Sequence, residues 1–164
     1  MARFFQELKS ILGPSPRLEG RDFRAVEEAW GVLLPDEYKK ISACYGDVLI
    51  DDFLYVYGPL KIAEKSEWMS DYVARGESRK IKHPVLPRDG GMLHWGHTIE
   101  GDKLFLVPGE GGEWTVSAFR RNWGDWYETD LRMDEWLFGV FSGTIETDWL
   151  PEWPQVHTFE VSSP

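Results

Sequence analysis

The stretch VEEAWGVLLPDEYKKISACYGD, residues 26–47, contains two short helices and the break between them. Its first apolar residues are spaced four apart, as on one face of a helix, and Gly31 follows as a residue that commonly ends helices. Pro35 suits the first position of a second helix, where its missing N–H is not needed. We therefore expect one helix that ends at Gly31 and a second that runs from Pro35 to Gly46.

The sequence on either side of this stretch alternates between helical and strand spacing. Apolar residues at helical spacing predict an N-terminal helix over residues 3–12, which we expect to pack against the rest of the chain. After Gly46 the spacing becomes that of short strands separated by turn-forming residues. The expected strands cover residues 48–50, 54–57, 92–95, 103–107, 114–119 and 126–129. Further helices are expected over residues 60–75 and between Asp130, as the cap, and Gly143.

Three segments have the composition of linkers, loops or irregular tails. Residues 13–20 are predicted to be a linker, and the basic segment 75–84 is predicted to be a mobile surface loop. The tail, residues 144–164, contains three prolines and two tryptophans, so we expect it to pack along the surface without regular structure. The chain has 164 residues, the size of one domain, and we expect a single domain over residues 1–164.

Charge and composition exclude several classes of partner. The formal net charge of −10 disfavours nucleic acids and anionic membranes, because proteins that bind them present basic faces. Cys44 is the single cysteine, so no intrachain disulfide can form. The N-terminus lacks the apolar core of a signal peptide, and no apolar run is long enough to span a membrane. These features predict a cytoplasmic protein whose partners are basic proteins.

The negative charge is confined to the second half of the chain. Residues 1–46 carry seven basic and seven acidic side chains, and residues 47–88 again carry seven of each. Residues 89–164 carry four basic and fourteen acidic side chains, so they hold the whole excess of ten. A partner surface, if it is acidic, is therefore expected among the strands of the second half.

The order of these elements resembles the SMI1/KNR4 family, also called the SUKH superfamily, over residues 20–143. In the opening stretch, the residues that carry the resemblance are Glu28, Gly31, Leu34-Pro35, Tyr38 and Gly46. In the second half they are Leu93-His94-Trp95-Gly96, Thr98, Gly101-Asp102, Leu104, Trp114-Thr115-Val116 and the stretch from Trp136 to Gly143.

The resemblance implies a fold and a role. The implied fold class is α+β, with a single, mainly antiparallel β-sheet flanked by helices. The implied role is that of a bacterial immunity protein, which binds and neutralises a cognate toxin, often a nuclease. The family has no shared catalytic residues, so the resemblance implies neither an enzyme nor a cofactor. A regulatory or scaffold protein of the same fold is the alternative.

Catalytic and metal-binding interpretations of the sequence are weaker. His94 and His97 are the best metal candidates, but zinc needs three or four ligands and no further His or Cys completes the set. The glycine-rich stretch 109–113 lacks the Lys-Ser/Thr of a phosphate loop. A hydrolase that uses paired carboxylates stays open as a minor alternative, because acidic residues are plentiful. We expect no catalytic residue, metal or cofactor.

Acidic and aromatic residues near strand ends are the candidate partner-binding residues. Carboxylates steer a basic partner, and aromatic side chains anchor it after contact. The candidates are Asp51, Asp52, Tyr55, Tyr57, Glu100, Asp102, Glu110, Glu113, Glu128 and Asp130. We expect them to contact a cognate, basic protein toxin.

Overall fold

The computed structural model describes residues 2–17, 22–81 and 83–162. Its helices are α1 (Ala2–Leu12), α2 (Arg24–Trp30), α3 (Asp36–Tyr45), α4 (Ile62–Ala74) and α5 (Met133–Ser142), with a short 3₁₀ turn, η1 (Glu110–Gly112). Its strands are β1 (Val48–Ile50), β2 (Leu54–Val56), β3 (Leu93–Thr98), β4 (Lys103–Pro108), β5 (Trp114–Arg120), β6 (Asp125–Glu128) and β7 (Phe159–Val161). Among the described residues, no helix is both long enough and apolar enough to cross a lipid bilayer.

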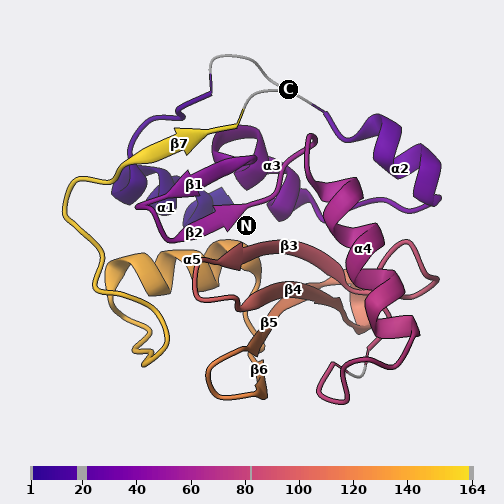
Figure 1. Ribbon diagram of the computed structural model, residues 1–164. Coiled ribbons are helices and arrows are strands. Elements are labelled where there is room, and N and C mark those ends of the chain that lie inside the picture. The colour runs from indigo at the N-terminus through magenta and orange to yellow at the C-terminus, as the bar shows by residue number, and fades with distance from the viewer. Residues whose placement is uncertain (1, 18–21, 82, 163–164) are drawn as a thin grey trace.

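The strands form one sheet in the order β6-β5-β4-β3-β2-β1-β7, and every pair of neighbours is antiparallel (Figure 1). From β1 to β6 each strand pairs with the next one in sequence. Only β7 departs from this order, because the chain returns from α5 to add it beside β1. The α+β fold with a single antiparallel sheet flanked by helices is therefore confirmed.

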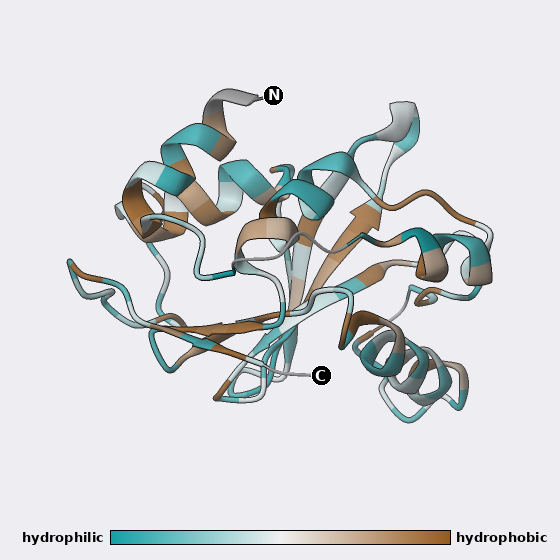
Figure 2. Ribbon diagram, turned by 90° about the horizontal axis from the view of Figure 1, so that it is seen from above, coloured by the Kyte–Doolittle hydropathy of each residue, from teal (hydrophilic) through white to brown (hydrophobic). Residues whose placement is uncertain are grey.

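Alternate residues of the strands point to the two faces of the sheet, and each face has its own hydrophobic cluster. Leu104 and Leu106 of β4 belong to the larger cluster, which includes apolar residues of α1, α3 and α5. Phe105, between them, belongs to a smaller cluster with Met69 of α4. Seen from above, α4 lies on the opposite side of the sheet from the other packed helices (Figure 2). The sheet is thus a middle layer, covered fully on one face and partly on the other.

The tail was predicted to be irregular, and this is wrong for its last described part. Residues 159–161 form β7, which pairs with β1 in the register Ile50↔Phe159 and Val48↔Val161. The tail before β7 lacks regular structure, but Trp149 is buried and its ring lies 6.1 Å from that of Trp136. Strand β7 has only three residues, so its pattern alone gives no signal; β1 supplies the hydrogen bonds that make it a strand.

Two other predicted connections are also more ordered than expected. In the segment 75–84, of which residue 82 lies outside the described residues, Ile81 is buried in the smaller cluster, so its part of the segment is more than a surface loop. In the predicted linker 13–20, of which residues 18–20 lie outside the described residues, Ser15 and Arg17 bind the backbone near the start of β1. Both corrections have one cause, since a polar, glycine-containing sequence does not show which of its residues finds a partner far away in the chain.

Asp130 does not cap α5, as the sequence had predicted. The chain continues to pair with β5 beyond β6, because Thr129 N–H donates to Val116 O and Val116 N–H donates to Leu131 O. This pairing keeps the backbone extended, so the helix begins only after Arg132. The N–H of Arg132 then donates to a carboxylate oxygen of Glu135 at 3.3 Å, which satisfies a backbone donor at the helix start.

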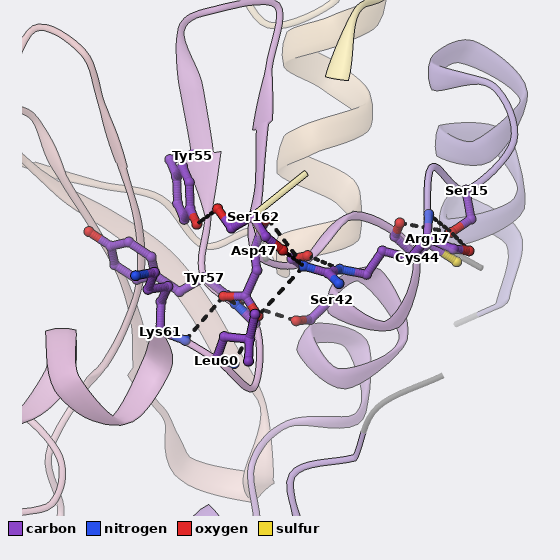
Figure 3. Close-up of polar contacts among 12 residues, drawn as sticks. Ser15, Arg17, Ser42, Cys44, Asp47, Tyr55, Tyr57, Leu60, Lys61 and Ser162 are labelled. Carbon is purple, nitrogen blue, oxygen red and sulfur yellow. Dashed lines mark hydrogen bonds and ion pairs between the residues drawn. The ribbon is translucent and has the colours of Figure 1, made fainter. Parts of the chain in front are cut away.

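A buried carboxylate joins the two halves of this architecture. Asp47 follows α3 with a positive φ of 55°, and its side chain is fully buried. Its carboxylate accepts hydrogen bonds from the N–H groups of Gly58 (2.8 Å), Leu60 (2.8 Å) and Lys61 (3.1 Å), directly before α4 (Figure 3). Arg17 approaches the same carboxylate at 3.9 Å.

Arg17 also holds backbone groups that lie far apart in the sequence. Its side chain donates hydrogen bonds to the carbonyls of Gly46 (2.5 Å), Asp47 (3.2 Å) and Ser162 (3.4 Å) (Figure 3). The segment after α1, the start of β1 and the end of β7 therefore meet at one guanidinium group. A buried guanidinium is tolerated here because its donors and the nearby carboxylate satisfy each other.

We predict that Asp47→Asn lowers the free energy of unfolding by about 3 kcal/mol. The amide keeps one acceptor oxygen but turns its NH₂ toward a backbone N–H, and it removes the carboxylate that lies 3.9 Å from Arg17. Urea unfolding followed by circular dichroism measures the change. Asp52→Asn is the matched control, because Asp52 also has a positive φ (55°) but is exposed. Equal effects of the two substitutions would contradict this role of Asp47.

Candidate functional site

Three turns of the sheet lie side by side at the strand ends on the left of Figure 1. The β1–β2 turn touches the β3–β4 turn through the bond from Ile99 N–H to Phe53 O, at 3.0 Å. The β3–β4 turn touches the β5–β6 turn, because Asp102 accepts a hydrogen bond from Arg121 N–H at 2.9 Å. Six neighbouring strands span roughly 25 Å at this end, a width suited to a protein partner.

The exposed side chains of these turns include acidic and apolar residues beside Arg121 and Asn122. We call the acidic and apolar group the strand-end surface: Asp52, Ile99, Glu100 and Trp123 from the turns, half-buried Asp125 at the start of β6, and Glu146 and Asp148 from the tail. Its exposed apolar members are Ile99, at 61% exposure, and Trp123, at 44%. The surface is thus a mixture of carboxylates with one aliphatic and one aromatic side chain.

Basic side chains offset part of this charge. The guanidinium of Arg120 lies 2.6 Å from Asp125 and 3.4 Å from Asp148, and it stacks over the Trp123 ring at 5.0 Å. This contact fixes Trp123 against a rigid neighbour. Arg121 adds a further positive charge in the β5–β6 turn. The carboxylates still outnumber the cations, so the surface remains acidic.

The structure brings only part of the predicted partner-binding set to this surface. Asp52 and Glu100 are exposed there. Glu110 and Glu113 are exposed too, but in the β4–β5 turn at the opposite end of the strands. Glu128 accepts a hydrogen bond from the indole N–H of Trp126 at 3.0 Å. Asp130 is exposed after β6, beyond the strand-end surface.

Two predicted residues are buried, so their side chains cannot form an exposed contact. Asp102 is 1% exposed and accepts a hydrogen bond from the Thr98 hydroxyl at 2.6 Å, in addition to the Arg121 N–H. It therefore holds two turns together. Tyr57 is 2% exposed and lies beside half-buried Tyr55, with ring centres 5.6 Å apart. Both tyrosines lie on a face of the sheet and not at its strand ends.

Asp51 is also structural. Its carboxylate is 3% exposed and lies 2.6 Å from Nδ1 of His157, and it accepts a hydrogen bond from Thr158 N–H at 2.8 Å. The N–H of Asp51 in turn donates to Thr158 O at 2.8 Å. Asp51 thus fastens the tail to the β1–β2 turn just before β7 begins. Neighbouring aspartates in one turn have different roles, which their sequence does not reveal.

Sequence reasoning missed Trp123, Asp125, Glu146 and Asp148. Trp123-Gly124-Asp125 has the composition of a tight turn, and a tryptophan in such a turn is a signal of exposure that could have been used. The two tail carboxylates had no such signal. They reach this surface because Trp149 packs against Tyr127 and Trp136 and carries the preceding residues with it.

A second group of polar aromatic residues lies on the sheet face that α4 partly covers. The hydroxyl of Tyr57 lies 2.6 Å from Nδ1 of His97, whose ring stacks on Tyr55 at 5.3 Å. Nδ1 of His94 lies 3.0 Å from Leu104 O. A carbonyl oxygen only accepts hydrogen bonds, so Nδ1 of His94 carries a proton. No group of three or more His, Cys, Asp or Glu side chains placed to hold a metal ion includes His94 or His97 within the described part of the chain.

Burial keeps both histidines neutral near pH 7. Burial lowers the pKa of His94 to about 3. Burial, with the charges of Lys65 and Lys103, lowers the pKa of His97 to about 4. Burial also raises the pKa of Tyr57, so its hydroxyl keeps its proton near pH 7. The Tyr57 hydroxyl donates to Nδ1 of His97 in the tautomer whose ring proton is on Nε2, and it accepts in the other tautomer.

Comparison of the chain with protein-family models, with curated proteins and with solved structures finds no match. The strand-end surface and the group of polar aromatic residues beside α4 are therefore interpreted from their own geometry and charge.

We predict that Asp51→Ala loosens the tail, while Asp52→Ala does not. Both residues have positive φ (53° and 55°), so the backbone strain introduced by alanine is equal. Only Asp51→Ala removes the acceptor of His157 and Thr158. We expect faster amide hydrogen exchange in β7, by about tenfold or more, corresponding to a loss of more than about 1.4 kcal/mol in local stability. Equal exchange in the two variants would contradict the fastening role.

We predict that His97→Gln weakens the acid destabilisation of the protein. The pKa of His97 is lowered on folding from 6.5 to about 4, so the unfolded chain binds a proton that the folded chain does not over this range. The free energy of unfolding therefore falls as the pH drops from about 6.5 toward 4, by at most about 1.4 kcal/mol per pH unit for this group, and by less because solvent screens the half-exposed ring. Urea unfolding at several pH values should give a shallower slope for His97→Gln than for the wild type. Parallel slopes would show that the His97 ring is not kept neutral by the fold.

Proposed function

We propose that the chain is a cytoplasmic, immunity-type protein that binds and neutralises a cognate basic toxin, such as a nuclease, through the strand-end surface. The observation that carries the proposal is the grouping of exposed carboxylates with Ile99 and Trp123 on adjoining turns. The resemblance of residues 20–143 to the SMI1/KNR4 family supports the same role.

The charge of the surface suits the field of a nuclease. Nuclease active sites attract phosphate groups, so they present positive potential to the solvent. The strand-end surface presents Asp52, Glu100 and Glu146 as exposed carboxylates, and the chain as a whole carries a net charge of −10. Complementary fields of this kind raise association rates from about 10⁵–10⁶ to about 10⁸–10⁹ M⁻¹s⁻¹ at low salt. Fast capture is what a protective protein requires.

The apolar side chains of the strand-end surface slow the dissociation of a bound partner. Trp123 is 44% exposed and is held by Arg120, and tryptophan is among the residues that contribute most binding energy when a partner covers them. The turns are fixed to each other by the buried Asp102, so little conformational entropy is lost on binding. Charge therefore favours encounter, and the fixed apolar residues favour slow dissociation.

A regulatory or scaffold protein would use the same surface with a partner that is not toxic. Co-expression separates the two functions. The chain should restore growth to cells that produce the toxin encoded by the neighbouring gene, and a regulatory protein would not. Absence of a toxic neighbour, or absence of protection by the chain, would count against the immunity role.

We predict that Asp52→Asn combined with Glu100→Gln lowers the association rate with that toxin by about three- to tenfold at low salt. The combination Glu110→Gln and Glu113→Gln removes the same charge from the opposite end of the strands, so it is the matched control and should have a much smaller effect. Stopped-flow fluorescence at several salt concentrations measures both. Equal effects of the two pairs, or a rate that salt does not change, would contradict the position of the surface.

A further inference from the structure

A pocket of about 370 Å³ lies between α4 and the sheet. Its lining residues are Glu64, Lys65, Trp68 and Met69 of α4 and Tyr57, His94, His97 and Lys103 from the sheet side. The volume is in the range of sites that hold small organic molecules. The strand-end surface does not include any of these residues, so this pocket is a separate feature.

The two histidines give the pocket an acceptor and a donor. His94 is 2% exposed, and its Nδ1–H is used by Leu104 O. Its Nε2 is then an acceptor, and it has no hydrogen-bond partner among the described parts of the chain. The Nδ1 of His97 is bonded to the Tyr57 hydroxyl, so its Nε2 is the nitrogen left for a ligand, and it donates in the tautomer that carries the proton there. Nε2 of His94 is therefore available to accept a hydrogen bond from water or from a ligand in the pocket.

Two ammonium groups make the pocket locally positive in an acidic chain. Among the described residues, Lys65 and Lys103 form no ion pair, and Nζ of Lys103 donates to Gly101 O at 3.3 Å. Both lysines are half-buried and lie close enough to His97 to influence its charge. Glu64 is exposed, where water screens its carboxylate. An anion in the pocket would therefore find two unpaired cations in a partly dry site.

A flat apolar wall completes the pocket. Trp68 is 57% exposed, and its ring is stacked on Tyr72 at 5.2 Å with an angle of 13° between the planes. This support keeps one indole face in position beside the lysines. Large exposed aromatic rings next to a pocket are a common platform on which planar ligands stack.

We propose that this pocket binds a small organic oxyanion that carries a planar ring. Lys65 and Lys103 hold the phosphate or carboxylate group, and Nε2–H of His97 adds a neutral donor. Nε2 of His94 accepts a hydrogen bond from an O–H or N–H of the ligand, and Trp68 covers the ring. This function is independent of toxin binding.

Isothermal titration with four probes tests the proposal: adenosine 5′-monophosphate, 4-hydroxybenzoate, adenosine and inorganic phosphate. At least one of the ring-bearing anions should saturate the protein with a dissociation constant below about 1 mM, and should bind about tenfold or more tightly than adenosine and inorganic phosphate. The stronger of the two anions shows whether the site selects phosphate or carboxylate. No saturation by either below about 10 mM, or equal binding of inorganic phosphate, overturns the proposal.

Substitutions locate the binding. Lys65→Met and Lys103→Met should each weaken binding of the preferred anion by about tenfold. Lys40→Met is the matched control: Lys40 is exposed on α3, in the helix layer across the sheet, and it should leave the affinity unchanged. Trp68→Ala, at an exposed site, should weaken the ring-bearing anion and leave the weak binding of inorganic phosphate as it is. Equal losses in the Lys40 and Lys65 variants would show non-specific attraction and overturn the assignment.

Discussion

The carboxylate of Asp47 is the constraint on which the arrangement of this fold depends. It lies at the point where α3 ends and β1 begins, and it accepts three backbone hydrogen bonds from the segment that leads into α4. The backbone of the same residue pairs with Val56 of β2 through its N–H (2.7 Å) and with Ser162 through its carbonyl (2.8 Å). One residue thus fixes the direction of α4, the start of the sheet and the end of its edge strand. A buried charge is retained because three backbone N–H groups donate to it and Arg17 lies nearby, and its removal leaves those backbone donors unsatisfied in the interior.

Close packing around Asp47 explains two glycines and the position of the pocket. A Cβ on Gly58 would lie 2.7 Å from the Asp47 carboxylate, and one on Gly46 would lie 2.2 Å from the Ser42 hydroxyl oxygen. Only glycine lets the chain pass this close. Because residues 58–61 are fixed in this way, α4 begins at a defined place above the sheet and covers only part of that face. The part that it leaves open is where the lysines, the histidines and Trp68 meet.

The elements of this fold follow from local patterns, and the sites depend on contacts between distant residues. Spacing of apolar residues predicted α3, β1 and β4 to within one residue at each end, because those patterns reflect burial against one or two faces. Strand β7 has no such pattern, and its existence depends on pairing with a strand more than 100 residues earlier.

The sites also depend on contacts between distant residues, which a local sequence pattern does not show. Asp51 and Asp52 are adjacent and chemically identical, yet one holds His157 and the other is exposed. Asp102 and Tyr57 were expected at a surface because of their type, but their hydrogen bonds to Thr98 and His97 are what place them inside.

An acidic protein can carry a cationic pocket because charge acts locally at physiological salt. Fields between exposed groups are screened over about 8 Å, whereas half-buried groups such as Lys65 and Lys103 are screened less. The net charge of −10 therefore governs which macromolecules approach, and it does not set the potential inside a pocket. Burial strengthens this separation. It lowers the pKa of Lys103, and the charge of Arg121 adds to the effect. An anion that enters the pocket stabilises the charged ammonium. Its attraction to this half-buried ammonium is stronger than its attraction to an exposed lysine, because water screens the half-buried group less. Because Lys103 directly follows Asp102, the turn fixed at the strand-end surface also sets the position of one cation in the pocket.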